Sequence, residues 1–224
     1  MRFIFSRNGG EILIGGVIFD FDLTLVDSAK GIWGTLNALA QEKGLRRPDL
    51  PEVKKTIGWA LADAMRTFWG DGPVEREWLP RYRTLFEESH YAGVLPFAET
   101  VPMLRELQGR GMALAVATNR LNPESIVRAS GLEGYFSVIA GIENINPKPS
   151  PDVIFRALHK MELPAVKALY VGDSDIDMET ARRAGVMGVG VTTGNHDAAA
   201  LRQSGAGAVI STLKDLPGLL EELK

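Results

Sequence analysis

The chain contains no cysteine, so disulfide bonds, thiolate metal sites and cysteine nucleophiles are excluded. No apolar run approaches the roughly 20 residues that span a bilayer, and the N-terminal MRFIFSRNGGEILIGG has no apolar stretch of signal-peptide type. Neither sign of charge dominates, because 25 Lys and Arg oppose 28 Asp and Glu for a formal net charge of −3. These absences argue against membrane and nucleic-acid partners and predict a cytoplasmic protein, with no particular oligomeric state.

What is present is an ordinary globular composition, with 45% hydrophobic residues over 224 positions. Short apolar runs, typical of strands buried on both faces of a parallel sheet, occur at 17–21, 113–118, 137–140, 168–172, 188–191 and 208–210. Helical segments lie between them at 99–108, 123–129, 151–161, 177–184 and 198–203, several of them ending in glycine. This alternation predicts an α/β fold with a doubly wound parallel sheet.

Residues 29–94 interrupt the alternation, since they contain no convincing strand. Apolar residues recur there at helical spacing: Ile32, Leu36, Leu39, Ala40; Leu61, Ala64, Met65, Phe68; Trp78, Tyr82, Leu85, Phe86. We therefore expect an α/β core domain formed by 1–28 and 95–224, with an all-helical domain, 29–94, inserted into it. For residues 1–15, the Asn8-Gly9 pair fits either a hairpin turn or a frayed tail.

Acidic residues follow two of the apolar runs. Asp20 and Asp22 come directly after Val17-Ile18-Phe19, and the segment with Asp173 and Asp177 follows the run at 168–171. Open α/β sheets bind ligands at the carboxyl ends of their strands. Asp is also common in strand-exit turns and helix caps, and for Asp175 a cap or helix-dipole role is the expectation. The matched placement of the other four predicts a hard-oxygen site suited to Mg²⁺.

Two further elements can counter negative charge at the same sheet edge. Thr118 and Asn119 end the second core run, although this pair could merely cap the next helix. Lys148 lies between Pro147 and Pro149, which stiffen the backbone and fix where the ammonium points. Together with the carboxylates, these groups predict a phosphoryl-transfer site in which a carboxylate attacks and the metal and lysine neutralise the transferring group.

The sequence resembles the haloacid dehalogenase (HAD) superfamily, specifically its phosphatases with a helical cap of the C1 type. Four motifs stand in the order of that superfamily: Asp20-x-Asp22-x-Thr24, Thr118-Asn119, Lys148, and Gly172-Asp173-Ser174-x-x-Asp177. Residues 19–28, Thr118-Asn119-Arg120 and 172–185 look most like phosphoglycolate phosphatases. One departure is Leu23, which stands where a glycine is usual, so the geometry of that turn is expected to differ.

The resemblance implies a Rossmann-like core and a role for each motif residue. Asp20 is expected to be the nucleophile and a metal ligand. Asp22 is expected to act as general acid and base and to reach the metal through its backbone carbonyl. Thr118, Asn119 and Lys148 are expected to bind the phosphoryl group. Asp173 and Asp177 are expected to hold or support Mg²⁺. The implied reaction is Mg²⁺-dependent hydrolysis of a small phosphorylated metabolite through an aspartyl-phosphate.

Several alternatives share parts of this pattern. Haloacid dehalogenases and phosphonate-cleaving relatives do not use the second aspartate as an acid and base, so Asp22 argues against both. A sugar-phosphate phosphatase or phosphomutase and an inorganic pyrophosphatase stay open within the superfamily. A phospho-accepting receiver module also uses clustered Asp, Thr and Lys, but such modules are about half this length. For a substrate carboxylate, the sequence offers Lys54 and Lys55, just before Ile57-Gly58, and then Arg66.

Overall fold

The computed structural model describes residues 13–223, and the predicted alternatives for Asn8-Gly9 lie outside these residues. The sheet has six strands in the order β5-β4-β1-β6-β7-β8, and every neighbouring pair is parallel. The strands are β1 Gly16–Phe19, β4 Ala113–Ala117, β5 Val138–Ala140, β6 Ala168–Gly172, β7 Met187–Val191 and β8 Ala208–Ile210. The predicted doubly wound α/β fold is therefore confirmed, and the predicted strand limits differ from those of the structure by at most two residues.

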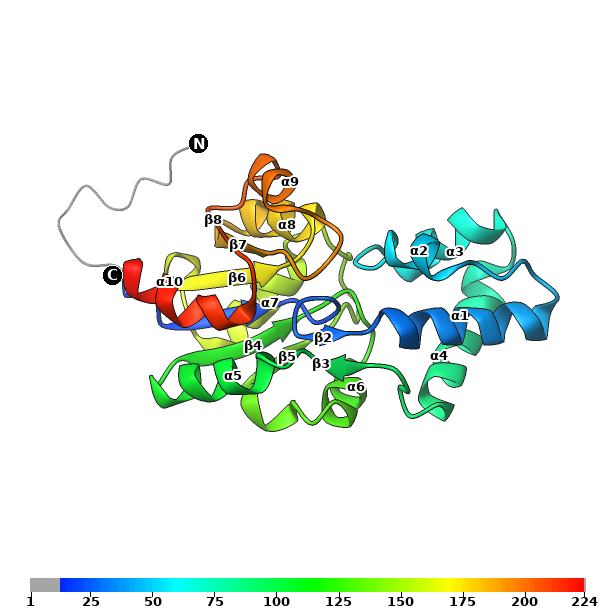
Figure 1. Cartoon of the computed structure of the whole chain (residues 1–224), viewed down its shortest axis with the longest axis horizontal. Helices are drawn as coiled ribbons and strands as arrows, with labels where there is room; N and C mark the ends of the chain where they lie inside the picture. The colour runs from blue at the N-terminus through cyan, green and yellow to red at the C-terminus, as the bar shows by residue number, and fades with distance from the viewer. Residues whose placement is uncertain (1–12, 224) are drawn as a thin grey trace.

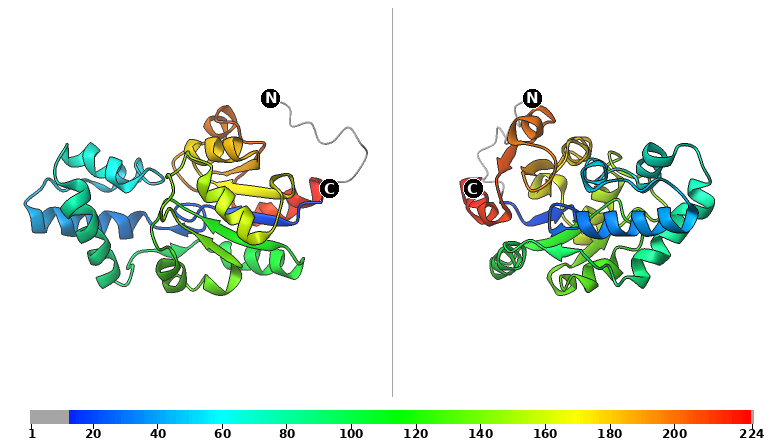
Figure 2. Two further views of the ribbon diagram at one scale, coloured as in Figure 1. Left: turned by 180° about the vertical axis from the view of Figure 1, so that it is seen from behind. Right: turned by 45° about the vertical axis from the view of Figure 1, so that its right-hand side comes forward.

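Both faces of the sheet are buried, which explains the absence of polar alternation in the strands. Val17 and Phe19 of β1 pack into one hydrophobic cluster, and Ile18 between them packs into another. Helices cover the two faces and one edge (Figures 1 and 2). They are α5 Thr100–Gly109, α6 Glu124–Ala129, α7 Asp152–Met161, α8 Asp175–Ala184, α9 Ala198–Gln203 and α10 Leu216–Glu222. No helix between residues 13 and 223 has the length and apolar character needed to cross a membrane.

The remaining helices lie together beyond the carboxyl end of the sheet (Figure 1). We call this segment, residues 29–94, the helical insert. It contains α1 Ala29–Lys43, α2 Leu50–Lys54, α3 Leu61–Trp69, a π-helical turn at Val74–Trp78 and α4 Leu79–Glu88. A two-stranded antiparallel ribbon, β2 Val26–Asp27 and β3 Leu95–Pro96, carries the chain into and out of it.

Leu23 has a left-handed backbone, with φ of 57°, in the region that favours glycine. Such a conformation is strained for a residue with a Cβ, by about 1–2 kcal/mol. The leucine side chain is nevertheless 4% exposed, because it packs against Ala29 and against Ile57 of the helical insert. Leucine at this position thus adds an apolar contact between the turn and the insert.

Replacing Leu23 should separate these two effects. Leu23→Ala retains the strain and loses the packing, so we expect a loss of about 2–4 kcal/mol in the free energy of unfolding. Leu23→Gly loses the same packing but relieves the strain, so it should be more stable than the alanine variant by about 1 kcal/mol. Urea denaturation followed by circular dichroism measures both values. An alanine variant as stable as the glycine variant would contradict the strain argument.

Candidate active site

The four predicted motifs lie together at the carboxyl edge of the sheet. Strand β1 lies between β4 and β6, and Phe19 of β1 is level with Val116 and with Val171. The residues that follow these three strands therefore leave the sheet side by side, which places Asp20, Thr118 and Asp173 at one edge. Lys148 comes from the loop after β5, just before α7. The convergence follows from the strand order and the register.

Lys148 occupies the centre of the site. Its ammonium nitrogen donates hydrogen bonds of 2.7 Å to Asp20 Oδ1 and 2.7 Å to Asp177 Oδ1, and the residue is 4% exposed. It also donates to the hydroxyl of Tyr170, at 3.1 Å. Burial alone would lower the pKa of Lys148, but Asp177 and Asp20 outweigh it and raise the pKa well above its usual value. The side chain is therefore a permanent cation that joins two acidic motifs.

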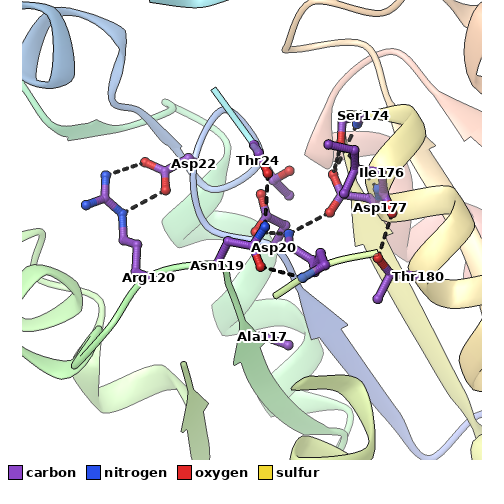
Figure 3. Close-up of polar contacts among 12 residues, drawn as sticks. Asp20, Asp22, Thr24, Ala117, Asn119, Arg120, Ser174, Ile176, Asp177 and Thr180 are labelled. Atoms are coloured by element: carbon purple, nitrogen blue, oxygen red, sulfur yellow. Dashed lines mark hydrogen bonds and ion pairs between the residues drawn. The ribbon is translucent and has the colours of Figure 1, made fainter. Parts of the chain in front are cut away.

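Local hydrogen bonds fix Asp177, and a hydrogen bond from the first motif fixes Asp173. Ser174 is the N-cap of α8, and Asp177 completes a capping box with it. Asp175, predicted to be a cap or a helix-dipole partner, lies in the first turn of α8, the position of a dipole partner. Asp173 accepts a hydrogen bond of 3.1 Å from the hydroxyl of Thr24, in the first motif. Figure 3 shows Thr24, Asp20 and Asp177 converging from the two strand ends.

The carboxylates of Asp20, Asp173 and Asp177 form a buried cluster with ligand oxygens within 4.8 Å of one another. Burial raises the pKa of Asp20 to about 7, against the opposing effect of Lys148. Burial, together with Asp177 and Asp20, raises the pKa of Asp173 well above its usual value. Three acids face one ammonium here, so the cluster lacks compensating positive charge. A divalent cation with a preference for oxygen ligands fits this set of residues.

Asp22 lies outside that cluster, and its carboxylate faces the other way (Figure 3). Arg120 donates two hydrogen bonds to it, from Nε to Oδ2 at 2.7 Å and from Nη2 to Oδ1 at 2.7 Å. Burial alone would raise the pKa of Asp22, but the Arg120 guanidinium outweighs it and holds the pKa below its usual value. The guanidinium also lies over Phe86 of the insert, 5.2 Å from the ring centroid.

Thr118 and Asn119 differ in the hydrogen bonds that their side chains make. The Asn119 side chain accepts a hydrogen bond of 2.7 Å from the Lys148 backbone N–H and donates one of 3.1 Å to the carbonyl of Gly58. It thus ties the lysine loop and the helical insert to the second motif. Among the described residues, the Thr118 hydroxyl has no hydrogen-bond partner, and Thr118 lines the cavity described next.

A cavity of about 190 Å³ lies between the sheet edge and the helical insert. Asp20, Asp22, Thr118, Asn119 and Lys148 line its inner end. The rest is lined by insert residues from α1, α3, α4 and the loop 56–59, and by core residues 120–122 and 126. Within the described chain, the predicted cations Lys54, Lys55 and Arg66 do not line it. Arg66 instead pairs with Asp63, at 3.0 Å, and with Glu75.

Sequence reasoning missed several residues that shape the site. Arg83 of α4 lines the rim of the cavity, and its position inside an amphipathic helix gave no sign of this. Tyr170 was part of an apolar run, yet its hydroxyl lies 3.1 Å from Asp177 Oδ1. Gly194 follows β7 and packs so closely that a Cβ on it would be 1.7 Å from Asp173 Oδ2. Arg120 could have been identified from the sequence as a residue near the site, because it directly follows Thr118-Asn119.

Comparison with known proteins agrees with this geometry. The family model described as haloacid dehalogenase-like hydrolase matches residues 17–191. The chain is 30% identical to "Probable phosphatase IndB" of Dickeya dadantii, over 92% of this chain and 94% of that protein. It is 33% identical to a phosphoglycolate phosphatase of Aquifex aeolicus, over 75% of this chain and 80% of the relative.

A solved structure shares the fold closely. The crystal structure of a predicted phosphoglycolate phosphatase from Haemophilus somnus superposes with a TM-score of 0.84, covering 94% of this chain and 99% of that one, at 22% identity. The matched residues 17–191 contain all four motifs that meet at the sheet edge. The chain belongs to the haloacid dehalogenase-like hydrolases and is a phosphatase of that family.

Proposed function

We propose that this phosphatase hydrolyses small phosphomonoesters with Mg²⁺ as cofactor, through a phosphoryl group carried on Asp20. The observation that carries the proposal is the position of the Asp20 carboxylate. It lies at the inner end of a cavity, 2.7 Å from a buried ammonium and beside two further buried carboxylates. A carboxylate so placed can attack phosphorus while positive charge stabilises the phosphoryl oxygens.

The residues around Asp20 divide the remaining tasks. Thr118, Asn119 and Lys148 bind the phosphoryl oxygens. Asp22 gives a proton to the ester oxygen as its bond to phosphorus breaks, and then takes a proton from the water that hydrolyses the aspartyl-phosphate. Asp20, Asp173 and Asp177, with the backbone carbonyl of Asp22, would hold Mg²⁺. When bound, the ion supplies positive charge that offsets these carboxylates and the phosphoryl group.

Arg120 sets a condition on this mechanism. While its guanidinium holds the Asp22 carboxylate at 2.7 Å, that carboxylate stays ionised and directed away from Asp20. Proton donation therefore requires the pair to separate. An arriving phosphate ester offers Arg120 another anion, which lowers the cost of that separation.

The proposed domain division follows the predicted one. Residues 1–28 and 95–224 form the catalytic core, and the helical insert, 29–94, is a cap that closes one side of the cavity. The relatives named phosphoglycolate phosphatases support a small phosphorylated metabolite as substrate. A sugar phosphate and inorganic pyrophosphate are the other substrates that the same core could accept.

The first prediction concerns the two aspartates of the first motif. Asp20→Asn should lose at least about 1,000-fold in kcat while keeping its circular dichroism spectrum, because the attacking oxygen is replaced in an unchanged shape. Asp22→Asn should also lose turnover, with phosphoryl groups retained on Asp20, since the water lacks its base. Phosphate release and intact-protein mass spectrometry measure these effects. Near-normal turnover by Asp20→Asn would eliminate the proposed nucleophile.

The second prediction concerns the metal and can be checked without substrate. Mg²⁺ at 100 times its dissociation constant should stabilise the fold by about 2.7 kcal/mol, because it binds the folded site and not the unfolded chain. A thermal melt in Mg²⁺ against one in chelator measures the shift. Asp173→Asn should abolish it, whereas Asp175→Asn, on the same helix-start segment but outside the cluster, should retain it. Equal shifts in the two variants would argue against the cluster.

The third prediction concerns Lys148. In chelator at pH 8, Lys148→Met should lower the free energy of unfolding by about 3–5 kcal/mol, because Asp20 and Asp177 lose their shared counter-ion. Saturating Mg²⁺ should recover part of the loss. Denaturant titration with and without the metal tests this. A methionine variant as stable as wild type in chelator would show that the ammonium does not hold the acids together.

A further inference from the structure

The outer part of the cavity differs in chemistry from the end near Asp20. The apolar side chains that line it come mainly from the helical insert, and several of them continue into the main hydrophobic core. The most enclosed of them are Leu36 of α1, Ala64 of α3, and Tyr82 and Phe86 of α4, each at most 3% exposed. A group bound between α1 and α4 is therefore removed from water and placed against carbon atoms.

The cations that could face a substrate carboxylate there are few. Among the described residues that line the cavity, Lys148, Arg120 and Arg83 are the cationic ones. Lys148 is paired with Asp20. Arg120 is paired with Asp22 and, once released, faces the phosphoryl group of the arriving ester. Arg83 is exposed at the rim, where Glu87 also lines the cavity. A carboxylate held between α1 and α4 would lose its hydration without gaining a buried counter-ion, which is unfavourable.

The size of the cavity limits the body that it can hold. Its volume of about 190 Å³ is well below the range of drug-sized pockets, roughly 300–1,000 Å³. It is close to that of apolar cavities of about 150 Å³ that bind benzene. Since this volume includes the end near Asp20, a phosphoryl group joined to a single ring or to a short branched chain matches the space.

The apolar wall carries the hydroxyl of Tyr82, which lines the cavity and is 3% exposed. Burial raises the pKa of Tyr82, so the hydroxyl stays neutral. This hydroxyl can therefore accept or donate a single hydrogen bond to an uncharged group on a bound molecule.

We propose that the alcohol half of the substrate is an uncharged, apolar body about the size of one ring, which lies between α1 and α4 while its phosphoryl group faces Asp20. This inference rests on the proposed function and names its substrate class. Transfer to Asp20 breaks the bond between phosphorus and the ester oxygen, which takes the Asp22 proton and leaves as a neutral alcohol. One water then releases inorganic phosphate and returns a proton to Asp22, so the net reaction is hydrolysis of the ester.

Three esters with alkyl leaving groups test the inference on the wild-type protein: benzyl phosphate, ethyl phosphate and 2-phosphoglycolate. Their leaving oxygens are all of the alkoxide type, so differences in kcat/KM report mainly on how the body is bound. We expect benzyl phosphate to exceed each of the other two by at least about tenfold, from burial of the ring. A kcat/KM for 2-phosphoglycolate equal to or above that for benzyl phosphate would overturn the inference.

A matched pair of variants tests whether the apolar part of the substrate binds in the cavity. Ala64→Leu adds carbon atoms to the apolar wall, so it should raise KM for benzyl phosphate at least about tenfold and leave ethyl phosphate within about twofold. Ala62→Leu makes the same change on the same helix at a half-buried position outside the cavity lining. It should leave both esters unchanged. Equal losses on the two esters, or equal losses in the two variants, would count against the inference.

The inactive variant Asp20→Asn distinguishes an error in the inferred substrate class from an error in the proposed reaction. Calorimetric titration of Asp20→Asn in Mg²⁺ should show benzyl phosphate binding at least about tenfold more tightly than 2-phosphoglycolate. Asp20-dependent phosphate release with a preference for 2-phosphoglycolate would overturn the substrate class and leave the proposed function standing. Absence of Asp20-dependent phosphate release from every ester would overturn both.

Discussion

The site depends on the pairing of one buried ammonium with carboxylates from two separate strand ends. Asp20 follows β1 and Asp177 lies on α8 after β6, and Lys148 reaches both from a third loop. Each of these charges would be costly to bury alone. The lysine therefore makes the close approach of the two acidic motifs possible, and the orientation of α8, its capping box and the Tyr170 hydroxyl are arranged around the same atoms.

Much of this arrangement could be predicted from the sequence because it follows from patterns that are local along the chain. Apolar runs with no polar alternation indicated a parallel sheet, and residues at the ends of parallel strands must share one edge. Asp20, Thr118, Lys148 and Asp173 could therefore be placed together without knowledge of their contacts. The same kind of pattern predicts the limits of the helical insert, since the hydrophobic periodicity changes at residues 29 and 94.

The parts that could not be predicted depend on how elements far apart in the chain face one another. Lys54 and Lys55 precede a loop that does reach the cavity, but their side chains are exposed away from it. Arg83 looked like any charged residue on the polar face of a helix, and only the packing of α4 brings it to the rim. The bidentate contact between Arg120 and Asp22 spans 98 positions and has no periodic signal at all.

Gly194 carries a consequence for how the sequence can change during evolution. It belongs to none of the four motifs, yet a methyl group at that position would lie 1.7 Å from Asp173 Oδ2. Any side chain there must displace either the loop or the carboxylate, so selection on Asp173 acts on this glycine as well. Mutational drift in the loop after β7 is thereby restricted at one position, and a catalogue of catalytic motifs alone would underestimate how much of the chain is under selection for activity.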